Sequence, residues 1–375
     1  MKKSGYFEKD DHKIEGKMQT QMKSPIISTL KPNWPHVAWF LGLAFGFSWL
    51  VDLVLYLNGG LSNPATMLML QFQMLLPAFS AMLLGAFFFK ESPISYRTRR
   101  SASRWFVYYY FLLTFLYLLG AIVSLAQPDR TTTISSLLLI PSVLGLVLLI
   151  VLRLVGGKDT FASAGMAGGK ARIWAFYGLG LVAYYGFQTL LNYLFGLGEV
   201  VDLAAAFPQM AAANLPAGAL LPIMALNTVV IGPFLGLIIA FGEEYGWRGY
   251  LQTELIKLGR VRGVFLLGVI WGVWHWPVIW MGYNFPGQPV LGSLAMVVLG
   301  IVFAYFFAHS VFKSQGVWTA AYLHALNNQA LSFFFMAVVT PFDNAISFGA
   351  GFPGLALGAV VVLLLLRDPV WKSAE

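Results

Sequence analysis

Long stretches of apolar residues constrain this chain more than any other feature. Each stretch is close to the roughly 20 residues that a helix needs to cross the hydrocarbon of a bilayer. Backbone polar groups inside a bilayer must find partners within the chain, which favours α-helices for segments of this length. We therefore predict an all-α bundle of about ten membrane spans. Their residues are 36–58, 64–89, 104–126, 133–153, 174–198, 220–247, 263–282, 291–310, 317–339 and 350–366.

The composition supports a polytopic membrane protein. Of the 375 residues, 58% are hydrophobic and 11% are charged, whereas a soluble domain carries about 25% charged residues. The chain contains no cysteine, which excludes a disulfide framework, a thiolate metal site and a cysteine nucleophile. We expect the lipid bilayer as a partner, and no nucleic acid, because the positive charges follow the membrane topology.

The charged residues alternate between the predicted connections. All of the 24 Lys and Arg residues except Arg130 lie on one alternating set of connections, on the adjoining span ends, or in the two tails. Basic connections stay in the cytoplasm, so we expect both termini and the connection 248–262 to be cytoplasmic.

Four regions follow from this pattern. Residues 1–35 form a basic cytoplasmic tail, and residues 36–215 form the N-terminal transmembrane helices. Residues 216–340 form a helical core that carries the polar motifs. Residues 341–375 hold the last transmembrane helix and a cytoplasmic tail.

Three charged residues interrupt the apolar pattern near the end of the segment 220–247. Glu243 and Glu244 are adjacent, and Arg248 follows four residues after Glu244. A charge in hydrocarbon costs at least about 2.5 kcal/mol, so it usually pairs or takes part in function. The i,i+4 spacing lets Glu244 and Arg248 pair on one helix face. Glu243 points about 100° away and is free for another role. A salt bridge that only anchors the helix end would also explain these charges.

Two of the five histidines, His275 and His324, lie inside other apolar segments. A lone histidine in a membrane helix is more often a packing residue than a functional one. Two on different helices, together with a buried carboxylate pair, weaken that interpretation. Asn328 follows four residues after His324 and shares its helix face, whereas Asn327 is rotated by about 100°.

Whether these groups meet depends on where the helix that contains Glu243 ends. If it ended at Phe241, Glu243 would lie at the membrane surface, out of reach of His275 and His324. If it continues through Leu251, the rise of about 1.5 Å per residue brings the polar groups to one depth. We expect the longer helix, and a site that opens to the cytoplasm.

The three motifs, in this order, resemble those of the CPBP intramembrane proteases, also called the Abi or type II CAAX prenyl endopeptidase family. They are Glu-Glu-x-x-x-Arg at 243–248, aromatic-x-x-x-His at 271–275 and His-x-x-x-Asn at 324–328. The resemblance covers roughly residues 220–340. Trp271 stands where the family commonly has Phe, which keeps an aromatic packing role. The resemblance implies a membrane endopeptidase whose catalytic residues surround a cytoplasm-facing cavity, with supporting roles for Arg248 and Trp271. The catalytic residues are Glu243, Glu244, His275, His324 and Asn328.

The residues themselves indicate a hydrolase that activates water. The chain has no Gly-x-Ser-x-Gly, His-Glu-x-x-His or Gly-x-Gly-Asp motif. Glu243 would be the general base, and His275 would orient the water or help to activate it. His324 and Asn328 would stabilise the tetrahedral oxyanion. The second glutamate would hold the arginine or a catalytic histidine in place.

Two alternatives stay open. His275, His324 and Glu243 could hold a zinc ion with an open position for water. The family is labelled a metalloprotease, although a metal-free glutamate mechanism has been proposed for it. The bundle could also be a non-catalytic scaffold, such as a bacteriocin-immunity protein, or a transporter, but the complete set of motif residues favours an enzyme. We expect a membrane-associated peptide or protein as substrate, and the cytoplasmic membrane of a prokaryote as the location.

Overall fold

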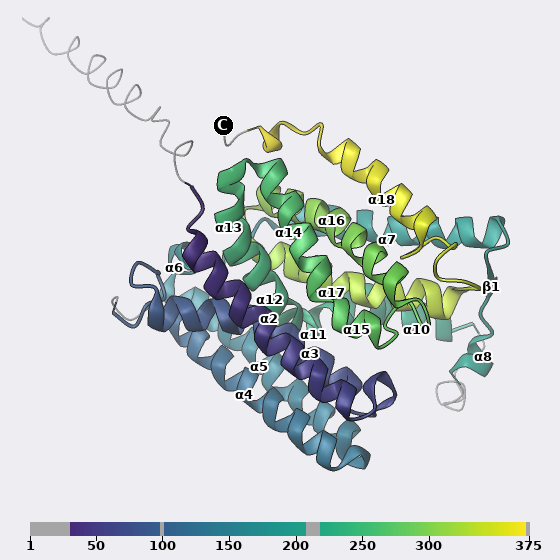
Figure 1. Ribbon diagram of the computed structural model, residues 1–375, viewed down its shortest axis with the longest axis horizontal. Coiled ribbons are helices and arrows are strands. Elements are labelled where there is room, and N and C mark those ends of the chain that lie inside the picture. Colours follow the sequence, from purple (N-terminus) through teal and green to yellow (C-terminus); the bar gives the residue numbers. More distant parts are fainter. Residues whose placement is uncertain (1–30, 98–100, 208–217, 373–375) are drawn as a thin grey trace, which may run out of the picture.

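The fold is an all-α bundle, as the apolar segments predict (Figure 1). The computed structural model describes residues 31–97, 101–207 and 218–372. Most of the predicted basic tail therefore lies outside the described residues, as does the segment 208–217 between the two halves of the chain.

Long helices form the N-terminal half. The side chains of Asn33 and Ser101 accept hydrogen bonds from backbone N–H groups three residues later, which fixes the first turns of two of these helices. α2 packs against α3, and α4 packs against α5. The helices are α2 (Trp34–Leu57), α3 (Thr66–Leu83), α4 (Ala102–Ala126), α5 (Thr131–Gly156), α6 (Lys158–Ser163), α7 (Ala171–Leu194) and α8 (Leu203–Ala206).

The C-terminal half contains shorter and more often interrupted helices. Its elements are α10 (Leu220–Leu226), α11 (Gly232–Leu235), α12 (Leu237–Glu244), α13 (Gln252–Leu255), α14 (Arg260–Trp274), α15 (Trp276–Trp280), α16 (Pro289–Ser314), α17 (Val317–Phe333) and α18 (Phe352–Leu365). π-helical turns continue α10, α12 and α17, at Asn227–Ile231, Tyr245–Leu251 and Phe334–Val338. Such turns occur frequently at functional sites.

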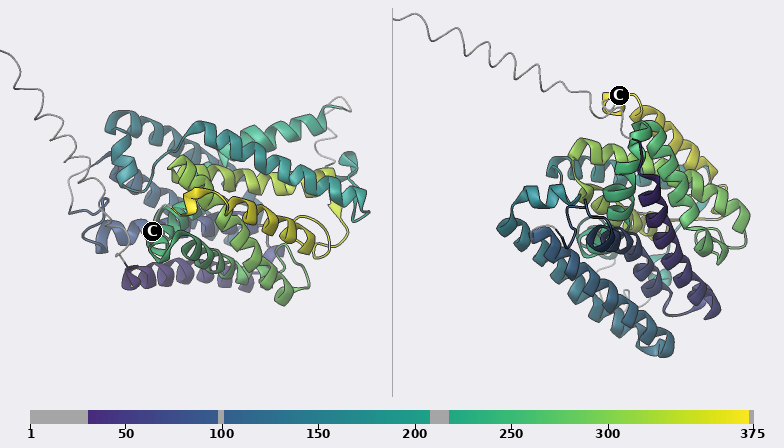
Figure 2. Two further views of the ribbon diagram at one scale, coloured as in Figure 1. Left: turned by 90° about the horizontal axis from the view of Figure 1, so that it is seen from above. Right: turned by 60° about the vertical axis from the view of Figure 1, so that its left-hand side comes forward.

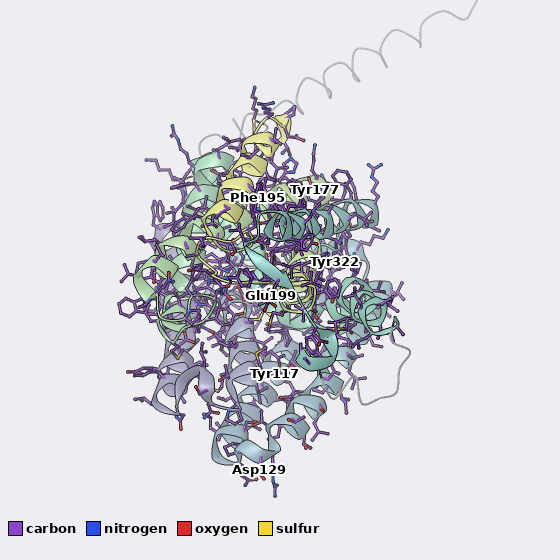
Figure 3. All side chains as sticks on the ribbon, turned by 90° about the vertical axis from the view of Figure 1, so that its right-hand side faces the viewer. Tyr117, Asp129, Tyr177, Phe195, Glu199 and Tyr322 are labelled. Atoms are coloured by element: carbon purple, nitrogen blue, oxygen red, sulfur yellow. The ribbon has the colours of Figure 1, made fainter. Side chains whose placement is uncertain are left out.

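A small antiparallel ribbon joins the two halves. β1 (Gly198–Val200) pairs with β2 (Val339–Pro341), so that Glu199 lies opposite Thr340. Figure 3 views the molecule from this end, with Glu199 near the centre and Asp129, from the connection between α4 and α5, at the edge.

All ten predicted segments are helical over most of their length, but the count of ten spans is not confirmed. Among the described residues, five helices are long and apolar enough to cross a membrane. A sixth span results if Leu220–Leu235 and Leu237–Leu258 are taken together, although they meet at a 60° bend. The helices α14 and α17, which carry site residues, are not among these candidates. The number of spans and the orientation of the termini stay predictions.

α12 is the central element of the bundle. All eight of its residues are buried, and it packs between α3 and α17. A Cβ atom at Gly242 would lie 2.4 Å from the Met74 carbonyl oxygen, and one at Gly246 would lie 2.5 Å from Pro77 Cβ. The two glycines thus let α12 and its continuation approach the α3 backbone closely. The helical path continues beyond Glu244 to Leu251, as predicted.

The connections between the helices lie at two ends of the molecule. In Figure 1, α6, α13 and the C-terminal end lie on the left, whereas β1, α8 and α10 lie on the right. The view from above in Figure 2 keeps α6 and the C-terminal end on the side opposite β1 and α8. We call these the basic end and the opposite end, because the predicted basic connections meet at the first.

The close contact between α12 and α3 predicts that Gly242→Ala destabilises the protein by about 1–3 kcal/mol, since the added methyl group meets backbone atoms. Thermal unfolding in detergent measures this effect. Gly42→Ala is the matched control in α2, because a Cβ atom there meets nothing within 4 Å. It should leave the melting temperature unchanged or raise it. Equal melting temperatures for the two variants would contradict the contact.

Candidate active site

A buried ion pair connects the two ends of the Glu-Glu-x-x-x-Arg motif. Arg248 Nη1 lies 3.0 Å from Glu244 Oε1, and both side chains are fully buried. The same oxygen lies 2.8 Å from His324 Nδ1. The predicted pairing is therefore present, and Glu244 also holds a histidine from α17.

Aromatic rings surround the charged end of Arg248. Its guanidinium carbon lies 4.2 Å from the centre of the Trp271 ring and 5.1 Å from that of Phe307. Its Nε and Nη2 atoms have no hydrogen-bond partner among the described residues. Cation–π attraction is strongest where water is excluded, so the rings and one carboxylate together hold the arginine.

Glu243 is buried, with 2% of its surface exposed, and it takes no part in this ion pair. Its Oε2 atom accepts a hydrogen bond of 2.8 Å from Trp271 Nε1. Its Oε1 atom lies 3.9 Å from His324 Nε2. That separation is too long for a direct hydrogen bond, and a water molecule can bridge it.

The partners of the two histidines determine which ring nitrogen faces the site. His275 Nδ1 lies 2.8 Å from the Trp271 carbonyl oxygen, and His324 Nδ1 lies 2.8 Å from the Glu244 carboxylate. Both partners are acceptors, so each Nδ1 carries a hydrogen. Each Nε2 is then left for a water molecule or a substrate. His275 occupies the break between α14 and α15, two residues before Pro277, which lacks the backbone N–H needed for a helical hydrogen bond.

Trp271 does more than the packing role predicted from the sequence. Its indole N–H donates to Glu243, its carbonyl oxygen orients His275, and its ring covers Arg248. The ring contact would survive in phenylalanine, but the hydrogen bond to Glu243 would not. The tryptophan at this motif position, in place of phenylalanine, is the sequence feature that could have indicated the hydrogen bond to Glu243.

A cavity of about 120 Å³ lies against these groups. Buried sites of more than about 10–15 Å³ can hold a water molecule, so this one has room for several. Its lining brings together most of the predicted catalytic residues, namely Glu243, His275, His324 and Asn328. Glu244 is behind them, and it holds His324.

Asn327 also lines the cavity, although the helix periodicity predicted that it points away from Asn328. Its Oδ1 atom accepts a hydrogen bond of 2.5 Å from the Tyr185 hydroxyl group. Its Nδ2 atom donates to Asn328 Oδ1 at 3.3 Å. The cavity is wide enough to reach both residues. Tyr185 of α7 thus helps to place Asn328, and no motif in the sequence indicates this role.

A second polar contact borders the cavity from the N-terminal half. Gln73 of α3 lines the cavity and donates to Asp52 Oδ2 of α2 at 2.8 Å. Asp52 is buried, with 1% of its surface exposed. The resemblance covers only the C-terminal half, so it could not indicate these residues.

The alternative zinc site does not fit the arrangement. Among the described residues, no group of three His, Cys, Asp or Glu side chains is placed to hold a metal ion. Glu243, His275 and His324 border one cavity but do not converge as ligands. The metalloprotease interpretation is therefore not supported.

The cavity extends to the opposite end of the molecule, and the expectation that it faces the cytoplasm stays a prediction. Its lining includes Tyr283, Asn284, Gly349 and Ala350, which belong to connections at the opposite end. In the described parts of the chain, no residue of the connections 90–104, 153–172, 248–262 or 311–316 lines it. The depth estimate placed the groups at one level, but it could not show on which side the space beside them lies.

Comparison with known proteins adds one finding. Residues 225–330 match the family model described as type II CAAX prenyl endopeptidase Rce1-like. This match includes all three motifs and confirms the resemblance inferred from them. Comparisons with curated proteins and with solved structures gave no match.

The contact between Trp271 and Glu243 predicts that Trp271→Phe lowers the turnover number about 10-fold or more. A hydrogen bond to a charged group contributes about 1.5–3 kcal/mol, and each 1.36 kcal/mol corresponds to a factor of ten in rate. Trp247→Phe is the matched control, because its Nε1 atom is buried without a partner among the described residues. Equal turnover in the two variants would show that the hydrogen bond does not position Glu243.

Proposed function

We propose that this chain, whose residues 225–330 match the type II CAAX prenyl endopeptidase family model, hydrolyses a peptide bond with a water molecule activated by Glu243. One observation carries this proposal. Of two adjacent buried carboxylates, Glu244 is used by an ion pair, whereas Glu243 borders a cavity together with two histidines.

The first step in this proposal is attack by water. A water molecule between Glu243 Oε1 and the Nε2 atoms of the histidines would donate one proton toward the carboxylate. The neutral Nε2 of His275 would accept its other hydrogen and orient it. The water oxygen adds to the substrate carbonyl carbon, the proton moves to Glu243, and the carbonyl oxygen becomes an oxyanion.

His324 would stabilise this oxyanion as an imidazolium ion. Only the protonated ring can donate from Nε2, because Nδ1 already faces Glu244. Glu243, Glu244 and Arg248 together carry one net negative charge, so a protonated His324 makes the buried cluster neutral. When the proton moves from water to Glu243, the negative charge moves to the oxyanion, so the cluster and the oxyanion together stay neutral. A site that excludes water favours such a preorganised arrangement.

Asn328 would supply a second donor to the oxyanion. Its Oδ1 atom already accepts from Asn327, which leaves its amino group for the substrate. In the second step, protonated Glu243 gives its proton to the leaving nitrogen as the carbon–nitrogen bond breaks. This returns the carboxylate to its starting state, and the products are a carboxylic acid and an amine.

The substrate is a membrane-associated peptide or protein in this proposal, and the location is the cytoplasmic membrane of a prokaryote. Proteomic comparison of membranes that contain wild type or Glu243→Gln identifies cleaved proteins. A peptide from such a protein then serves in a cleavage assay with purified enzyme in detergent or liposomes.

Glu243→Gln is expected to abolish turnover while binding persists, because glutamine keeps the shape but cannot take the proton. Asn328→Ala should lower the rate about 10²- to 10³-fold, the usual effect of losing one oxyanion donor. His36→Ala is the control, because His36 stacks on Phe89 at the start of α2, far along the chain from the motifs. Full activity in Glu243→Gln would overturn the proposal in favour of the non-catalytic scaffold.

A further inference from the structure

The basic end of the site is sealed by packed aromatic residues. Phe241 of α12 stacks on Trp318 of α17 with ring centres 4.0 Å apart, and Trp318 is buried. The Tyr245 hydroxyl group donates to the Ala164 carbonyl oxygen at 3.0 Å, which ties the segment after α6 to this layer. Together with buried Arg248, these residues separate Glu243 and Glu244 from the basic connections.

Connections at the opposite end form the rim of the cavity. Tyr283 lines the cavity and is 39% exposed, so it lies at the opening. Gly349 and Ala350 line it from the connection before α18. Asn344 Nδ2 donates to the Asn284 carbonyl oxygen at 2.9 Å and joins the two rim connections. Gly349 N donates to Gln188 of α7, which fixes the rim to the bundle.

The charge pattern assigns a side of the membrane to each end. The sealed end holds the basic connections, which the positive-inside rule places in the cytoplasm. The rim connections 281–289 and 340–351 contain no Lys or Arg. We propose that the cavity takes its substrate from the extracytoplasmic face, between the connection 281–289 and the connection 340–351. This inference rests on the proposed protease function and departs from the cytoplasm-facing cavity that the resemblance implies.

The lining also indicates which polypeptide segment fits. Apart from Glu243 and the two histidines, the described lining carries no Asp, Glu, Lys, Arg or His. Its other walls are largely apolar, with Leu70, Met74, Met296, Leu299, Phe303 and Leu331. Burying an unpaired charge there would be unfavourable, whereas apolar side chains gain from burial. The substrate class is therefore an exported or membrane-anchored polypeptide with uncharged, apolar residues beside the cleaved bond.

The absence of cysteine allows a direct test by single-cysteine labelling. A charged, membrane-impermeant maleimide is added to right-side-out and to inverted vesicles that contain the full chain. Asn328→Cys and Leu331→Cys report on the cavity, and Ala350→Cys reports on the rim. Thr253 is exposed beyond the packed aromatic residues, so Thr253→Cys is the control for the basic end. Ser62 is exposed at the predicted outer surface, so Ser62→Cys is the control for that side.

We expect both cavity cysteines, the rim cysteine and Ser62→Cys to react in right-side-out vesicles, and Thr253→Cys to react in inverted vesicles. At least a tenfold difference in labelling rate between the two preparations is expected at each position. Cavity cysteines that react only from the side that labels Thr253→Cys would overturn the inference. So would cavity cysteines that react from neither side while Ala350→Cys reacts.

This result is independent of the protease assignment, because labelling requires no turnover. If the cavity cysteines react only from the side that labels Thr253→Cys while cleavage still depends on Glu243, the proposed access route is rejected and the protease function is kept. Correct labelling without any Glu243-dependent cleavage product would reject the protease instead.

Discussion

The structure depends on one ion pair in a dry environment, that between Glu244 and Arg248. Its carboxylate oxygen also holds His324, and its guanidinium group lies on Trp271 and Phe307. Trp271 in turn contacts Glu243 and His275. A buried charge without its partner is strongly unfavourable, so loss of either member would release the groups that surround it. The pair thus orients groups from three helices toward one cavity.

The same arrangement separates the tasks of two neighbouring glutamates. Glu244 forms an ion pair with Arg248 and contacts His324, so its carboxylate has a structural role. Glu243 receives one hydrogen bond from an indole and faces the cavity with its other oxygen. Adjacent helix positions point in directions about 100° apart, which is what makes this division possible. Gly242 of α12 and Gly246 of its continuation bring both carboxylates close to α3, where bulk water has little access.

The sequence predicted the features that depend on local spacing. The i,i+4 rule anticipated the pairing of Glu244 with Arg248, and the apolar runs anticipated where the helices lie. Contacts between distant helices were not predictable. The bond from Tyr185 to Asn327 joins α7 to α17, and the indole of Trp271 reaches Glu243 from α14. Such contacts depend on helix crossing and rotamers, which periodicity does not encode. The end of the bundle toward which the cavity extends was not predictable for the same reason.

The division between a structural and a reactive glutamate is tested most directly by comparing Glu244→Gln with Glu243→Gln in thermal unfolding. Both changes keep size and remove one negative charge, so they differ only in which carboxylate is lost. Glu244→Gln leaves Arg248 buried without its counter-ion and should cost about 3–5 kcal/mol. Glu243→Gln should melt within a few degrees of wild type. Equal melting temperatures, or a greater loss in Glu243→Gln, would contradict the account.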